Sequence, residues 1–293
     1  MADIDVAGLR ASYAGPHELV RTSDGKTLFV RRWNPASEPD VSVLILHGIT
    51  GYGGPYGPMI ADQLSAVGFG VFAMDLRGHG LSDGTRGDYP SSARLVADLS
   101  DTVALAKSKS RKLVVLGHSL GALSAVIAVK SRPQDIDGLI ILSAARRIRT
   151  GVYPKPSANA VVKTLFGVAL LRGTPVIEYR RTGQLGLDDP LFVFHYSARF
   201  YAALYGVGAL RVIGMLRDGA IDSPNLKFDR KLRIPLLVGV GEQDELFSAE
   251  AAKGFCDGID CDDKEFFVIP GARHAFFPQG SWGPLVSWLG TKF

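Results

Sequence analysis

The strongest chemical signal in the sequence is a serine in a turn bracketed by glycines. The motif GHSLG at Gly117–Gly121 directly follows the apolar run 113–116 and directly precedes a stretch with helical spacing. A serine at such a sharp strand-to-helix turn presents its hydroxyl at a helix N-terminus, where backbone N–H groups favour developing negative charge. The flanking glycines let strand and helix approach closely. We therefore predict that Ser119 is a nucleophile.

A serine hydroxyl needs a base to take its proton, and histidine is the usual choice. His274 lies in the loop after the last apolar run of the chain, 266–269. We predict that His274 is the general base. Five other histidines are less suitable. His17 is N-terminal, and His195 lies in a region without strand-like runs. His47 and His79 stand next to glycines, where His47 is better placed to shape a turn, and His118 points away from Ser119 by adjacency.

The base in turn needs a carboxylate that orients it. The run 236–240 is followed by three acidic residues, Glu242, Asp244 and Glu245. We choose Asp244 as the orienting acid and keep Glu242 and Glu245 as alternatives.

Two backbone N–H groups are expected to form the oxyanion hole that holds the negative charge of an acyl-transfer intermediate. One belongs to Leu120, directly after the nucleophile. The other is expected in the loop after the first core strand, His47–Gly51, where we nominate Ile49.

Short apolar runs separated by helix-like stretches must position these residues. The runs are too short to span a membrane and do not alternate, which is typical of strands buried on both faces of a parallel sheet. Ligands bind beyond the C-terminal ends of such strands, where Ser119, Asp244 and His274 fall. The expected strands are 41–46, 71–74, 113–116, 139–142, 236–240 and 266–269, and the expected helices are about 56–67, 93–107, 120–130 and 249–256.

This alternation predicts an α/β fold with a mostly parallel, doubly wound sheet. The runs 17–21 and 27–33 around the turn Ser23-Asp24-Gly25 predict an N-terminal antiparallel hairpin at its edge. Residues 145–222 contain no buried-strand run, and their apolar residues follow helical spacing. We therefore predict a core domain of residues 1–144 and 223–293 with a helical cap, or lid, inserted at 145–222.

The inserted region also differs in charge. It holds eleven lysines and arginines against five acidic residues, a net charge of +6, whereas the whole chain has +4. The remainder of the chain therefore carries −2, and the basic character belongs to the insertion. Such a surface favours transient contact with an anionic membrane or an anionic head group, although it also suits a solvated face.

Several segments together carry a family resemblance. They are His47-Gly48, the run DLRGHGLSDG at Asp75–Gly84, Arg86-Gly87, GHSLG, Gly241-x-x-Asp244, Gly271-x-x-His274 and Asp189-Pro190-Leu191 in the insertion. In these the chain resembles the α/β-hydrolases, within the branch of monoacylglycerol lipases and lysophospholipases that includes serine aminopeptidase-like members. The chain order Ser119, Asp244, His274 is also the order of α/β-hydrolases. After His47-Gly48 the sequence Ile49–Gly54 departs from the branch's usual pattern.

The resemblance implies hydrolysis of a carboxylic ester through an acyl-enzyme, without a metal or organic cofactor. The expected partner is a small acyl ester of the monoacylglycerol or lysophospholipid type. A serine nucleophile argues against the epoxide hydrolases and haloalkane dehalogenases of this fold, which use aspartate. A thioesterase, an acyltransferase, an amidase and a low-turnover receptor with an intact triad stay open as alternatives.

Composition bounds the remaining function classes. The chain has 293 residues, of which 46% are hydrophobic and 21% charged, as in globular proteins. Neither a zinc-ligand spacing nor an aromatic–basic RNA-binding motif supports a nucleic-acid partner. The start of the sequence does not resemble a secretory leader, so we expect a cytoplasmic protein. We interpret Cys256 and Cys261 as reduced structural thiols, with a local bridge as the alternative; the oligomeric state stays open.

Overall fold

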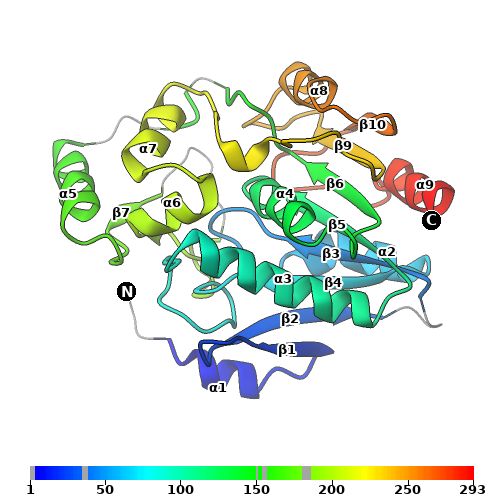
Figure 1. The fold of residues 1–293 in the computed structure, drawn as a ribbon, viewed down its shortest axis with the longest axis horizontal. Coiled ribbons are helices and arrows are strands. Elements are labelled where there is room, and N and C mark those ends of the chain that lie inside the picture. The colour runs from blue at the N-terminus through cyan, green and yellow to red at the C-terminus, as the bar shows by residue number, and fades with distance from the viewer. Residues whose placement is uncertain (1–3, 35–38, 150, 154–156, 180–185) are drawn as a thin grey trace.

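The computed structural model describes residues 4–34, 39–149, 151–153, 157–179 and 186–293. Its main sheet has eight strands in the order β1-β2-β4-β3-β5-β6-β9-β10 (Figure 1). The strands are β1 (His17–Arg21), β2 (Thr27–Trp33), β3 (Val41–Leu46), β4 (Gly70–Asp75), β5 (Lys112–His118), β6 (Gly138–Leu142), β9 (Leu236–Gly241) and β10 (Lys264–Ile269).

The pairing confirms the predicted sheet. From β4 to β10, neighbouring strands pair in parallel, whereas β1 pairs antiparallel with β2 and β2 pairs antiparallel with β4. Strands β3, β4, β6 and β9 are buried along their whole length, as expected for strands covered on both faces. Their C-terminal ends therefore meet at one edge of the sheet, where loops are free to carry functional groups.

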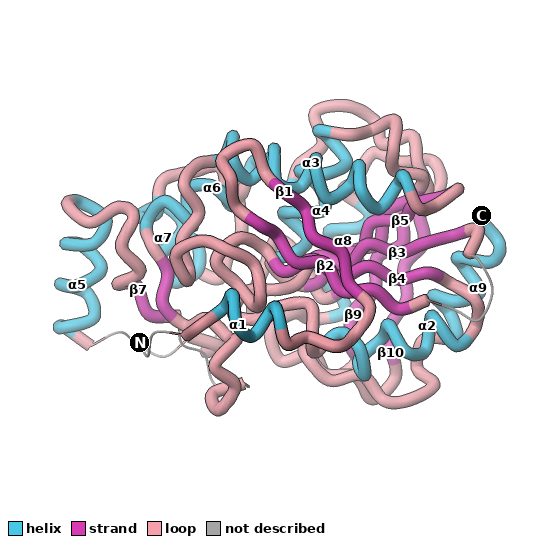
Figure 2. Tube along the Cα trace, turned by 90° about the horizontal axis from the view of Figure 1, so that it is seen from below, coloured by secondary structure: helices cyan, strands magenta, loops and turns pink. Residues whose placement is uncertain are grey.

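Helices cover both faces of the sheet (Figures 1 and 2). Helices α3 (Ser92–Ser108), α4 (Gly121–Ser131) and α8 (Ala249–Asp257) share one apolar core with the sheet. The other face packs against η1 (Gly57–Ala61), α2 (Asp62–Ala66) and α9 (Gly283–Lys292). Cys256 and Cys261 are free, buried thiols, as we interpreted them. No helix among the described residues is long and apolar enough to cross a bilayer.

Three elements differ from the expected ones. The helix expected at about 56–67 begins with a π-helical turn, η1, and continues as α2. Helix α1 (Val6–Ala11) buries no residue, so its sequence has no apolar period to reveal it. Helix α9 buries Leu285, Trp288 and Leu289 at helical spacing, but we did not predict a helix from this pattern.

The segment between β6 and β9 gathers beyond one end of the sheet, at the left of Figure 1. It contains α5 (Ala158–Ala169), α6 (Ala198–Tyr205), α7 (Ala209–Arg217) and the short helix η2 (Pro224–Leu226). It also contains a short antiparallel strand pair, β7 (Ile177–Glu178) and β8 (His195–Tyr196), which the prediction of a mainly helical segment did not include. Residues 150, 154–156 and 180–185 of the predicted insertion lie outside the described residues.

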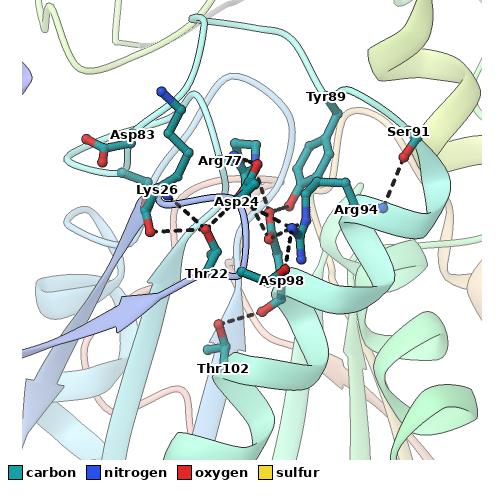
Figure 3. A network of polar contacts seen from close by, with 12 residues as sticks. Thr22, Asp24, Lys26, Arg77, Asp83, Tyr89, Ser91, Arg94, Asp98 and Thr102 are labelled. Carbon is teal, nitrogen blue, oxygen red and sulfur yellow. Dashed lines mark hydrogen bonds and ion pairs between the residues drawn. The ribbon is translucent and has the colours of Figure 1, made fainter.

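A buried polar network fixes the loop after β4 to the core (Figure 3). The guanidinium of Arg77 donates to both carboxylate oxygens of Asp98 in α3, at 2.7 and 2.9 Å, and to Asp24 in the β1–β2 turn. Tyr89 donates to the same Asp98 at 2.8 Å. Arg77 and Asp98 are almost fully buried, so breaking one partner would leave an uncompensated charge in the core. The loop after β4 is therefore held rigidly against the core, and so are the segments that pack on it.

Candidate active site

Ser119 stands on the sharp turn between β5 and α4. Its backbone φ is +54°, a conformation that side chains other than glycine rarely adopt. The neighbouring glycines are required sterically: a Cβ on Gly121 would lie 2.0 Å from the carbonyl oxygen of Leu46, and one on Gly117 would lie 2.5 Å from that of Gly121. The turn therefore holds the serine hydroxyl at the C-terminal end of β5 and at the start of α4.

His274 and Asp244 lie next to Ser119 in one hydrogen-bonded chain. Ser119 Oγ is 2.9 Å from His274 Nε2, and His274 Nδ1 is 3.0 Å from Asp244 Oδ2. An ionised carboxylate only accepts, so Nδ1 carries the imidazole proton and Nε2 is left to accept from the serine hydroxyl. The imidazole is thus oriented as a base toward Ser119. Residues from the ends of three different strands meet here across 155 positions of sequence.

The environment keeps Asp244 ionised although it is 1% exposed. Burial by itself raises the pKa of the carboxyl group, but the imidazole of His274 and the N–H of Phe247 outweigh it and lower the pKa to about 2. The N–H groups of Leu246 and Phe247 donate to Oδ1 at 2.8 and 2.9 Å. Because the folded-state pKa lies below the unfolded value, Asp244 stabilises the fold above pH ~4, and this contribution is lost as the pH falls toward ~2.

The two alternative acids hold the histidine loop through its backbone. Glu245 accepts from the N–H of His274 at 2.9 Å, and Glu242 accepts from the N–H of Gly271 at 2.9 Å. Asp244 is the acid that contacts the imidazole at Nδ1. The geometry therefore separates one carboxylate at the ring from two that fix the loop.

Ile49 and Leu120 flank Ser119 at the wall of the same cavity. In the part of the chain that the structure describes, neither backbone N–H donates a hydrogen bond. Leu120 is the first residue of the turn into α4, so its N–H belongs to the positive end of that helix. Two unused donors beside the serine hydroxyl suit a developing oxyanion.

His118 is a site residue that sequence reasoning missed. Adjacency does turn it away from Ser119, but its Nε2 is 2.7 Å from the carbonyl oxygen of His274. Its Nδ1 is 2.7 Å from the hydroxyl of Tyr56, which also accepts from the N–H of Gly48 at 3.1 Å. His118 thus links the loop of His274 to the loop of Ile49. The contact spans 156 residues, so no local pattern reveals it.

His47 shapes the loop after β3, as its glycine-rich context indicated. Its Nδ1 is 2.8 Å from the carbonyl oxygen of Gly48, and its Nε2 accepts from the N–H of Leu76 at 3.1 Å. Complete burial lowers the pKa of His47, so the ring is neutral and has one nitrogen free to accept. It therefore acts as a neutral bridge between two loops.

The cavity beside Ser119 is shared between the sheet end and the insertion. Leu123 of α4 and Phe247 after β9 belong to its core side. The inserted segment contributes Ala145, Ile148, Tyr153, Tyr179, Tyr205 and Ile221. Apolar and phenolic side chains thus surround the space next to Ser119, as in pockets for small organic ligands.

Comparisons with known proteins agree with this architecture. The family model of serine aminopeptidase, S33, matches residues 37–279. The human monoglyceride lipase is 32% identical over 90% of this chain and 84% of its own length. The uncharacterized protein YnbC of Escherichia coli is 27% identical over 86% of this chain, which spans only 42% of that longer protein.

Solved structures show the same fold. A soluble variant of monoglyceride lipase from Saccharomyces cerevisiae, solved with a substrate analog, superposes with a TM-score of 0.69 at 18% identity, covering 96% of this chain and 95% of the other. The predicted resemblance is confirmed by the match to more than half of the chain. The chain belongs to the serine aminopeptidase S33 family of α/β-hydrolases, in its branch similar to monoglyceride lipases.

Proposed function

We propose that Ser119, His274 and Asp244 are the catalytic triad of a carboxylic ester hydrolase. The observation that carries the proposal is the continuous hydrogen-bonded chain from Ser119 Oγ through the imidazole to the buried carboxylate. The relatives named as monoglyceride or monoacylglycerol lipases support ester hydrolysis as the enzyme class.

The mechanism follows from the proton positions. Ser119 attacks the ester carbonyl while His274 Nε2 takes the hydroxyl proton, and Asp244 stabilises the imidazolium that forms. The N–H groups of Ile49 and Leu120 hold the oxyanion of the tetrahedral intermediate. The imidazolium then protonates the leaving alcohol, and an acyl-enzyme remains on Ser119. Water, deprotonated by the same imidazole, releases the acid.

The proposed substrate is an ester with one acyl chain on a small alcohol, of the monoacylglycerol or lysophospholipid type. We propose that residues 145–222 are a cap on the core formed by 1–144 and 223–293. The insertion supplies Tyr153, Tyr179 and Tyr205 to the cavity beside Ser119, which supports a roof over the site. A roofed apolar pocket favours one chain and excludes bulkier lipids.

A contact with anionic membranes is a further proposal about partners. Val162, Phe166 and Leu170, in and just after α5, are 64%, 51% and 69% exposed. An exposed apolar stretch on a segment with net charge +6 suits transient binding to an anionic lipid surface. Among the described residues, these three side chains do not line the cavity beside Ser119. Cytoplasmic location stays a prediction.

The same triad also serves thioesterases, acyltransferases and amidases. A fluorophosphonate probe should label the wild-type protein at Ser119, and matched ester, thioester and amide substrates with one acyl chain then rank the reactions. We expect the highest kcat/KM for the ester. Labelling without turnover of any substrate would instead support a receptor on this fold.

We expect acyl chain length to set the rate. Each buried CH₂ contributes about 0.8 kcal/mol, so three or four added carbons should raise kcat/KM more than ~10-fold until the pocket is full. The measurement is kcat/KM for p-nitrophenyl esters of roughly two to sixteen carbons, with mono- and triacylglycerols alongside. Triacylglycerol should react poorly. A steady preference for acetate, or fast triacylglycerol hydrolysis, would contradict the roofed pocket.

The choice of acid is tested by three amide variants. Asp244→Asn should lower kcat by about 10⁴-fold, because an amide no longer fixes the tautomer that leaves Nε2 free to accept. Glu242→Gln and Glu245→Gln are matched controls that keep an acceptor for the loop N–H groups and should change kcat by less than about 10-fold. If either control loses more activity than Asp244→Asn, the orienting acid is misassigned.

A further inference from the structure

The loop that carries Ile49 is bonded to the insertion at Thr50 through the hydroxyl of Tyr196 and the N–H of Val193. Thr50, the next residue, has a backbone φ of +68°, an unfavourable value for a β-branched side chain. Its N–H donates to the hydroxyl of Tyr196 at 2.8 Å, and its carbonyl oxygen accepts from the N–H of Val193 at 2.9 Å. Tyr196 in turn donates to the carbonyl oxygen of Val193 at 2.9 Å. Both backbone groups of Thr50 are therefore tied to the strand β8 region.

Ile49 lies between two residues whose N–H groups end on tyrosine hydroxyls. Gly48 donates to Tyr56, which belongs to the core, and Thr50 donates to Tyr196, which belongs to the insertion. The direction of the Ile49 N–H depends on the backbone angles of Gly48 and Ile49. The hydrogen bonds of the Gly48 and Thr50 N–H groups fix the peptide planes on either side and so restrict these angles. Because Thr50 is strained, the Tyr196 bond opposes relaxation of the loop.

The phenol itself is rigidly placed. Tyr196 is fully buried, and its ring lies 4.4 Å from that of Phe200 and stacks on His79 at 5.9 Å. His79 Nε2 is 3.5 Å from the hydroxyl, at the limit of a hydrogen bond. The imidazole therefore contacts the phenol weakly and does not compete with the bond from Thr50. His79 belongs to the run Asp75–Gly84, to which the proposed chemistry assigns no role.

The segment around Tyr196 is also anchored at both sides. Arg86 donates to the carbonyl oxygen of Leu191 at 2.5 Å, and Ser197 donates from its N–H to the carbonyl oxygen of Gly87 at 2.9 Å. Arg199 donates to both carboxylate oxygens of Asp88. The Tyr196 hydroxyl is therefore fixed relative to the loop after β4, and through it to the sheet.

We infer that Tyr196 is a positioning residue for the oxyanion hole: its hydroxyl fixes the Thr50 peptide and thereby aims the N–H of Ile49 at the reacting carbonyl. The inference rests on the proposed ester hydrolysis at Ser119. In this arrangement the insertion supplies a part of the catalytic geometry as well as pocket wall. A misdirected oxyanion donor slows acyl transfer while leaving binding of the ground-state ester almost unchanged.

The test is Tyr196→Phe, which removes one oxygen and keeps the ring. We expect kcat to fall by about 10- to 100-fold, less than loss of a whole oxyanion donor, with KM changed by less than about threefold. The inhibition constant of an alkyl trifluoromethyl ketone, which forms a tetrahedral oxyanion on the serine, should rise by a similar factor. Tyr201→Phe is the matched control, because Tyr201 is also buried and its ring centroid lies 5.8 Å from that of Tyr196; it should keep wild-type kcat.

The experiment separates a loss of folded protein from a loss of catalytic rate. Active-site titration with a fluorophosphonate counts the folded enzyme, and rates are expressed per titrated site. An unchanged kcat in Tyr196→Phe, an effect on KM alone, or an equal loss in Tyr201→Phe would overturn the inference and leave the proposed function standing. A wild-type protein that takes up no fluorophosphonate and hydrolyses no ester would instead overturn the proposed function.

Discussion

Ser119→Ala is expected to lose about 10⁶-fold in kcat toward any ester that the wild-type protein hydrolyses. The side chain loses only its oxygen, and alanine can occupy the same turn, so the fold should remain. Reaction with a fluorophosphonate should disappear as well. The measurement is kcat at saturating p-nitrophenyl ester, together with thermal unfolding of both proteins.

Ser124→Ala provides the control for this loss. Ser124 lies on α4, in the helix that begins beside Ser119, and its fully buried hydroxyl has no hydrogen-bond partner among the residues that the structure describes. Its removal should leave kcat at the wild-type level. Turnover near wild type in Ser119→Ala would show that another residue is the nucleophile.

His274→Ala is expected to fall almost as far as Ser119→Ala, because the serine hydroxyl without a base stays protonated and attacks poorly. The more informative result is the double variant. Residues that act as one unit do not add, so Ser119→Ala combined with His274→Ala should be no slower than either single variant.

The control for the base is His17→Ala, since His17 lies on the edge strand β1 and its Nδ1 is 2.9 Å from the carbonyl oxygen of Gly15. It should retain wild-type kcat per folded protein. A double variant whose losses multiply would mean that the two residues act in separate steps, contrary to the hydrogen bond between them.

The centre of the sheet was predictable because strands β3, β4, β6 and β9 are buried on both faces. The predicted runs 41–46 and 139–142 are almost continuously apolar, and they match β3 and β6 to within one residue. The glycines around Ser119 were a second signal in the sequence, since a Cβ at Gly117 or Gly121 would clash with backbone atoms. The placement of Ser119, Asp244 and His274 after strand ends then follows from the parallel topology.

The contacts that refine the site were not predictable in the same way. His118 to His274 and Thr50 to Tyr196 join residues separated by 156 and 146 positions, and each depends on one atom of a side chain. The strand pair β7–β8 has two residues per strand, too few for a period to show. Local patterns determine elements, whereas these bonds depend on how segments far apart in the sequence pack against one another.

The positive φ angles around the site imply a conflict between thermostability and catalysis. Thr50, Ser119 and Ser143 are non-glycine residues with φ of +68°, +54° and +50°, and all follow strands of the parallel sheet. Each such angle costs on the order of 1–2 kcal/mol, which glycine would largely avoid. Selection for heat resistance alone would therefore favour replacing these residues, and at Ser119 it would remove the proposed nucleophile. Engineering for stability should hold these positions fixed and work on the helices far from the sheet edge.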